Sequence, residues 1–469
     1  MTIKKCTSEM KQFREELYQN FNNRADTLME LVDAISSSPH VRSVVEYSLA
    51  PCFRRSYSTI FKAIAEMTWD ERSSAHLLSP YVPEPQARPF RLLGVDVTPQ
   101  PRQFAQTLAD RGMVYQPNTV KGNKPVTIGH QYSTVAALPE AESGVSSSWV
   151  IPLLTRRVPT DEDKELVGAE QIDLLLKDDR LPFNRDLCVE VGDTSYSKPA
   201  YLHANRHHRQ LVTIARVRGT RTFYRQPVAG TSESGAGHPT WYGDVFSLQE
   251  ESTWHTPDES LTITETSLRG KVHRVKIQAW HQMLMRGKYK PKRLPMHHHP
   301  FTLLWVVRYD EQGQLIYKRP LWLLVIGHRR HELSLLHIYD AYRQRFDLEH
   351  FFRFGKQKLL LTSFQTPEAV REESWWQLSH LAYAQLWLSR HLAYNLPRPW
   401  ERNLPSMKTR QMSPSLVQRD FERIIRQIGT PAKPPKRRGN SPGRRKGVRL
   451  PPRLRRKVVV KGQQKANSP

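Results

Sequence analysis

The chain has 469 residues, enough for two or three domains with large hydrophobic cores. Its formal net charge of +26 favours a polyanionic partner, nucleic acid before a membrane surface. The three cysteines, Cys6, Cys52 and Cys188, lie far apart, which argues against a disulfide framework and a thiolate zinc site. Because no run of about 18 apolar residues occurs and the first residues are charged, we expect a soluble protein without an export signal or membrane span.

Residues 8–70 carry apolar side chains at intervals of three and four, the periodicity of amphipathic helices. We therefore predict an N-terminal helical domain over residues 1–80. Its basic side chains, such as Arg42, Arg54 and Arg55, either contact DNA or lie on a solvated helix face.

Two apolar segments that follow each end in an aspartate, the first at Asp96 and the second at Asp193. An acid at the end of a buried strand is unfavourable unless it reaches solvent, a partner or a metal. The alternative is an aspartate that only caps the next turn. Short strands and an amphipathic helix lie between the two segments, so residues 88–215 are predicted to form the first part of an α/β core.

Residues 216–300 consist of short β-branched and aromatic segments separated by turn residues, which predicts a β-rich insertion. The insertion carries three consecutive histidines, residues 297–299. Adjacent histidines on a strand point to opposite faces, which favours a solvent loop over a zinc site. The core is expected to resume over residues 301–428.

A helix is predicted over residues 338–359, with Tyr342, Arg345, Glu349 and Lys356 on one narrow stripe. Such a stripe suits a carboxylate that holds a metal beside phosphates, with the two bases receiving phosphate oxygens. The alternative is a solvated face with ordinary ion pairs. Gly355 could end this helix, which would change the expected direction of Lys356 alone.

The last segment, residues 429–469, is rich in proline, glycine and basic residues. Residues 431–469 contain 14 lysines and arginines and no acid. We expect this tail to be disordered on its own and to make nonspecific contacts with nucleic acid.

The order Tyr342, two residues, Arg345, three residues, Glu349, six residues, Lys356 resembles the signature of DDE transposases of bacterial insertion sequences, of the insertion-sequence-four type. The resemblance implies an α/β fold: a ribonuclease H-like catalytic core with a mostly β insertion between the second aspartate and the glutamate, plus the N-terminal helical domain and the disordered basic tail. It also implies that the N-terminal helices bind the transposon end.

In this family the three acids hold two Mg²⁺ ions, and Mn²⁺ is able to replace them. By resemblance, Asp96 bridges both ions, Asp193 holds one and Glu349 the other. The activity implied is endonucleolytic cleavage at the transposon ends followed by strand transfer, that is, DNA transposition by recombination.

The resemblance also assigns DNA contacts to several side chains. Tyr342, Arg345 and Lys356 are expected to contact phosphates. Trp322 resembles a tryptophan that stacks on a flipped base, although a buried core position is the alternative and Trp305 competes for the role.

The expected partners are double-stranded DNA, as inverted-repeat ends and as target, and a second copy of the chain in a paired-end homodimer. No membrane partner is expected, and the location implied is the bacterial cytoplasm, in association with the nucleoid. Three alternatives stay open: a noncatalytic DNA-binding protein derived from a transposase, another ribonuclease H-like nuclease, and a basic RNA-binding protein suggested by charge alone.

Overall fold

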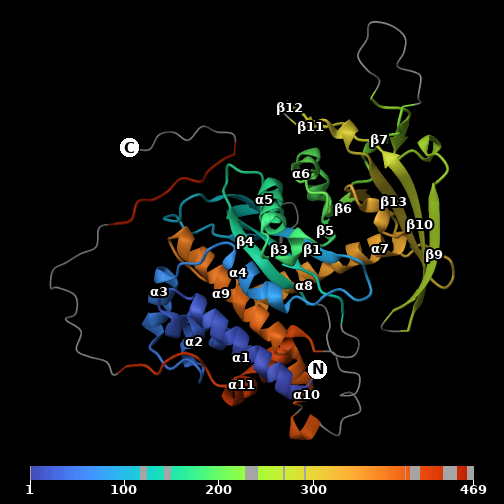
Figure 1. Ribbon diagram of the computed structural model, residues 1–469. Helices are drawn as coiled ribbons and strands as arrows, with labels where there is room; N and C mark the ends of the chain where they lie inside the picture. The colour runs from blue at the N-terminus through green and yellow to red at the C-terminus, as the bar shows by residue number, and fades with distance from the viewer. Residues whose placement is uncertain are drawn as a thin grey trace. The chain divides into compact units, whose positions relative to one another are not determined.

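The computed structural model describes residues 2–116, 124–141, 149–227, 241–267, 270–289, 292–396, 398–401, 412–436 and 452–461 (Figure 1). The chain divides into two compact units. The first unit consists of Met1–Pro83, Val97–Lys164 and Asp347–Pro469. The second consists of Glu84–Asp96 and Glu165–Phe346.

The first unit is built around a group of helices drawn from both ends of the chain. Its helices are α1 (Ile3–Asn20), α2 (Ala25–Ser37), α3 (Tyr57–Glu66), α4 (Ser73–Leu78), α8 (Phe346–Lys358, all but its first residue), α9 (Ala369–Leu388), α10 (Arg390–Asn395) and α11 (Pro414–Ile428). Helix α2 packs against both α9 and α11. Buried Arg14 of α1 donates to Asp33 of α2 and, over 2.7 Å, to Gln385 of α9. The helices expected in residues 8–70 are therefore present, but they share one core with the C-terminal helices.

Three strands of the first unit, β2 (Gly112–Tyr115), β3 (Val126–Ala137) and β4 (Ile151–Val158), form an antiparallel group with β3 in the middle. Helix α9 packs against β4, and Tyr132 of β3 stacks on Trp376 of α9 with ring centroids 4.0 Å apart. Glu372 of the same helix is fully buried and accepts hydrogen bonds from Arg102 and Tyr132. These contacts hold α9, a helix with buried residues on all its faces, against the strands.

Strand β1 (Arg91–Pro101) passes from the second unit into the first after Asp96. In the second unit the strand order is β1-β5-β6-β14-β13-β10-β9. Strands β1, β5 and β6 run parallel, whereas the remaining neighbours are antiparallel. The bounds are β5 (Cys188–Gly192), β6 (Leu211–Val217), β9 (Glu259–Thr266), β10 (Val272–Met283), β13 (Phe301–Tyr309) and β14 (Leu321–Ile326).

The remaining strands of the second unit form two small pairs, β7 (Thr222–Tyr224) with β8 (Val245–Ser247) and β11 (Lys288–Tyr289) with β12 (Lys292–Arg293). Residues 216–300 thus contain strands, as predicted. Two of these strands, β9 and β10, extend the sheet that β1, β5 and β6 begin. Helices α5 (Lys164–Lys177), α6 (Pro199–Ala204) and α7 (Leu335–Gln344) complete the unit, and α7 contacts β5 and β6.

Part of the tail expected to be disordered makes defined backbone contacts. The N–H of Arg456 donates to the carbonyl of Gln106, and the N–H of Val459 donates to the carbonyl of Arg111, each over 2.8 Å. Residues 437–451 and 462–469 lie outside the described residues. Across the part of the chain that the structure describes, no helix is long and apolar enough to cross a membrane.

Candidate active site

Asp96 lies within β1, and Asp193 directly follows the neighbouring parallel strand β5. The pairing of β1 with β5 runs from Arg91 opposite Cys188 to Gly94 opposite Val191, a constant offset of 97 residues. Asp96 and Asp193 have the same offset, one residue beyond the end of β5. Because neighbouring strands lie about 5 Å apart and in-register side chains share a face, and because both carboxylates act on the buried Tyr196, we infer that the two carboxylates lie close together. Both side chains are half-buried.

The turn after β5 fixes the direction of Asp193. Its carboxylate accepts the N–H of Ser195 over 2.7 Å and also accepts the Ser195 hydroxyl, so it caps the short 3-10 helix Thr194–Ser197. Gly192 permits this turn, since a Cβ there would lie 2.7 Å from the Cβ of Tyr196. The capping role and the proximity to Asp96 occur together, so the two interpretations of the sequence are compatible.

Tyr196 is a member of this site that the sequence did not indicate. Its side chain is buried, and its hydroxyl has no hydrogen-bond partner within the protein. Burial raises its pKa well above the usual value, and the charges of Asp96 and Asp193 raise it further. A buried neutral phenol therefore lies within electrostatic reach of both carboxylates.

Helix α7 brings Tyr342 and Arg345 to the same part of the second unit. Burial raises the pKa of Tyr342, whereas Arg345 and Arg216 act to lower it and Asp193 to raise it. The Arg345 guanidinium hydrogen-bonds the Tyr342 hydroxyl and lies 4.9 Å from the centre of the Phe346 ring. Arg216, an exposed residue of β6, is a second base near this tyrosine that the sequence analysis missed.

The helix expected over residues 338–359 is divided into α7 and α8 at Arg345. Glu349 lies in the first turn of α8 and is exposed. Gly355 does not end the helix, which continues to Lys358. The suggestion that Gly355 changes the direction of Lys356 was therefore wrong. Lys356 Nζ donates to the Thr98 hydroxyl of β1 over 2.5 Å.

Trp322 occupies the core position that the sequence analysis gave as the alternative to a DNA contact. It is 2% exposed and packs edge-on against Trp254, with ring centroids 5.1 Å apart, and beside Trp280. Trp305 lies opposite Trp322 on β13 and is half-buried.

The donor atoms at Asp96 and Asp193 are hard oxygens, which suit Mg²⁺ or Mn²⁺ better than softer metals. Two adjacent half-buried carboxylates repel each other, and a divalent cation relieves that repulsion. The residues present therefore fit a divalent metal.

The fold and the site define a mixed α/β protein with one aspartate, Asp96, within a parallel strand and a second, Asp193, directly after the neighbouring strand. A protein-family model described as "DDE superfamily endonuclease" matches residues 16–290, more than half of the chain. The chain therefore belongs to the DDE superfamily endonucleases. The matched residues contain Asp96 and Asp193 and end before Glu349. No curated protein matches the chain.

Proposed function

We propose that this endonuclease is a transposase that cuts DNA at transposon ends and joins those ends to target DNA. The observation that carries the proposal is the shared register of Asp96 and Asp193 on β1 and β5. Membership of the DDE endonuclease family and the net charge of +26 both support DNA as the substrate.

Glu349 is proposed as the third acid, and one contact and one helical spacing within the first unit support this role. Lys356 bonds Thr98, which follows Asp96 by two positions on β1 and so shares its face. Glu349 precedes Lys356 by seven residues on α8, which is close to two full turns. Both side chains therefore project from one side of the helix, the side from which Lys356 contacts Thr98.

When bound, two divalent ions supply an activated nucleophile and neutralise charge on the phosphate during an in-line displacement. In the proposed reaction, Asp96, Asp193 and Glu349 would hold these ions. Arg345 and Lys356 receive phosphate oxygens, and the Tyr342 hydroxyl, which accepts a hydrogen bond from Arg345, donates a hydrogen bond to a phosphate near the cut. The neutral phenol of Tyr196 adds no charge to the carboxylate pair.

Several finer assignments belong to the same proposal. The arrangement of β4, β3, β1, β5 and β6, with two strands parallel to β1 and with Asp96 within β1 and Asp193 directly after β5, supports a ribonuclease H-like core. The insertion-sequence-four type depends on the spacing from Tyr342 to Lys356, which lies beyond the family match. The paired-end homodimer and the end-binding role of the N-terminal helices depend on the same resemblance.

The test is cleavage of a duplex that carries the inverted repeats flanking the gene. Asp96→Asn, Asp193→Asn and Glu349→Gln are each expected to abolish Mg²⁺-dependent cleavage while leaving binding of the duplex largely intact, because the shape of each side chain is kept and only its charge is lost. Asp347→Asn, in the same helical turn as Glu349, is the matched control and should cleave normally. Full cleavage by Glu349→Gln protein would remove the third acid from the proposal. A wild-type protein that binds but never cleaves would instead indicate a noncatalytic DNA-binding protein.

A further inference from the structure

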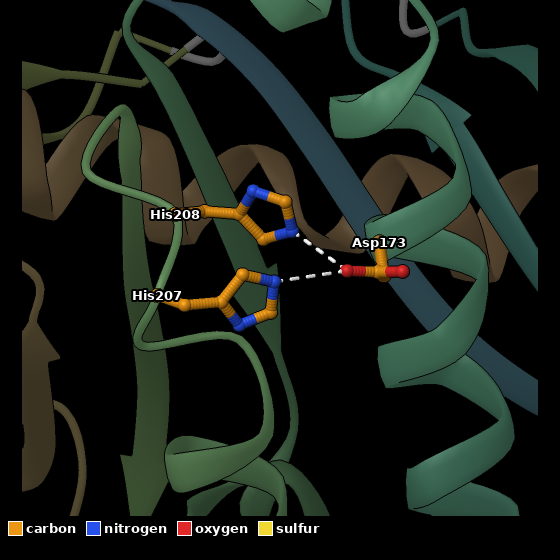
Figure 2. Close-up of side chains that lie close together, drawn as sticks. All are labelled: Asp173, His207 and His208. Atoms are coloured by element: carbon orange, nitrogen blue, oxygen red, sulfur yellow. Dashed lines mark hydrogen bonds and ion pairs between the residues drawn. The ribbon is translucent and has the colours of Figure 1, made fainter.

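A second group of potential ligands lies in the second unit, outside the candidate active site. Asp173 projects from α5, and His207 and His208 come from the loop between α6 and β6 (Figure 2). Of the residues that the structure describes, these form the one group of three or more His, Cys, Asp or Glu side chains whose ligand atoms all lie within 4.8 Å of one another.

Two of the three separations among the ligand atoms are already close to those that a single cation requires, and the third is within 4.8 Å. The Nε2 atoms of His207 and His208 lie 3.1 and 2.8 Å from the same carboxylate oxygen of Asp173. In a tetrahedral zinc site with ligands at 2.0–2.1 Å, the ligands are about 3.3 Å apart. Shifts of a few tenths of an ångström would therefore bring these two separations to the zinc value. Figure 2 shows both rings turned toward this one carboxylate.

The surroundings hold the ligands in place and leave an opening to solvent. Asn205 donates to the carbonyl of Ala169 over 2.9 Å, which ties the histidine loop to α5. Lys177 pairs with the other carboxylate oxygen of Asp173, over 2.8 Å, and leaves the shared oxygen to the two rings. The His208 side chain is 8% exposed, whereas that of His207 is 53% exposed and provides a route for an ion and a water ligand.

This group is distant from the paired aspartates. His208 precedes β6, whose first residue, Leu211, pairs with Cys188 at the start of parallel β5. Asp193 follows the last residue of β5, so the length of that strand, about 16 Å, separates the two places. The two groups also differ in chemistry, because imidazole nitrogens favour transition metals over Mg²⁺.

We propose that Asp173, His207 and His208 bind one divalent transition-metal cation of the Zn²⁺ type, with water completing the coordination. Each ring then carries its proton on Nδ1 and ligates through Nε2, so two neutral imidazoles and one carboxylate surround the ion. The bound ion fixes the loop before β6 to α5.

The test is Zn²⁺ binding to the full chain, measured by competition with a chromophoric chelator in excess Mg²⁺, which is added to fill the proposed carboxylate site. The wild-type protein should bind one Zn²⁺ that His207→Ala and Asp173→Asn proteins bind at least tenfold more weakly. His298→Ala is the matched control, because His297 and His298 are also adjacent, with rings 4.0 Å apart, yet lie outside this group. Wild-type affinity in the His207→Ala protein would overturn the proposal.

A second measurement does not depend on the variants folding. In wild-type protein, Zn²⁺ should slow amide hydrogen exchange in residues 203–211 and at the end of α5, whereas Mg²⁺ should not. Equal exchange with and without Zn²⁺ in those segments would also overturn the proposal. Neither readout requires DNA cleavage, so the result is independent of whether the chain is a transposase.

Discussion

At the scale of single residues, Tyr342 allows the sharpest test of the proposed phosphate contacts. Its hydroxyl is the only part that differs from phenylalanine, and its ring lies 5.8 Å from the Arg345 guanidinium. A hydrogen bond to a charged group contributes about 1.5–3 kcal/mol. Tyr342→Phe is therefore expected to lower the single-turnover cleavage rate roughly tenfold to a hundredfold while folding normally.

Tyr339→Phe is the matched control for that prediction. Tyr339 lies one turn earlier on α7, is also buried, and has a hydroxyl without a hydrogen-bond partner in the protein. Burial raises its pKa to about 12, so it stays neutral at working pH. Removing this hydroxyl should leave the cleavage rate unchanged. An equal fall in the cleavage rate of both variants would mean that the effect comes from altered packing of α7. Tyr342 would then make no specific contact with a phosphate.

At the scale of elements, the attachment of α9 to the strands of the first unit depends on a buried charge network. Glu372 accepts from Arg102 over 2.7 Å and from Tyr132 over 2.9 Å, and it pairs with His130 over 2.8 Å. Removing one member of a buried ion pair leaves the other uncompensated and costs about 3–5 kcal/mol. Glu372→Gln should therefore lower the free energy of unfolding by about that amount in urea denaturation.

The neighbouring Glu373 provides the matched control for this prediction. Glu373 pairs with Arg157 over 2.8 Å, but its side chain is 40% exposed, so Glu373→Gln should lower the free energy of unfolding by only about 0–1 kcal/mol.

The pH dependence of stability tests the role of Glu372 in a second way. Burial acts to raise the pKa of Glu372, yet His130 and Arg102 hold it below its usual value. The contribution of the Glu372 carboxylate to stability is fully present above its pKa in the unfolded chain, near 4.3, and is lost as pH falls through its lower pKa in the folded protein. Over that pH range the Glu372→Gln protein should therefore lose less stability than the wild-type protein.

The same elements show what the sequence could and could not predict. Asp96 and Asp193 could be predicted from the sequence because each ends an apolar segment, and a shared register follows from parallel pairing. The break in the helix at Arg345 could not be predicted, since the helical spacing of apolar residues continues through it without a proline or glycine. Tyr196 and Arg216 were missed because their roles depend on which strands become neighbours. The ligand group at Asp173 was missed because 34 residues separate its members and no local motif connects them.

At the scale of the whole molecule, charge is distributed unevenly along the chain. Residues 431–469 carry 14 of its bases and no acid, so the remainder has a net charge of 26 minus 14, or +12. Because each phosphate neutralised by a base releases condensed counterions, the affinity for duplex DNA should fall steeply with salt. The tail should account for part of that slope, and the remaining charge for the rest.

The contribution of the tail to the salt dependence can be measured apart from that of the remaining charge by substituting six bases that lie outside the described residues. These are Arg437, Arg438, Arg444, Arg445, Lys446 and Arg449. Replacing all six by glutamine should reduce the slope of log K against log salt by about 0.9 per lost phosphate contact, and by about 5 if all six contact DNA. Exchanging arginine and lysine at the same positions keeps the charge and should preserve the slope. The measurement is duplex binding by fluorescence anisotropy from about 50 to 200 mM salt. A nonspecific contact acts through charge alone. An unchanged slope in the glutamine variant would therefore mean that these six bases do not contact DNA and that the remaining bases of the chain account for binding.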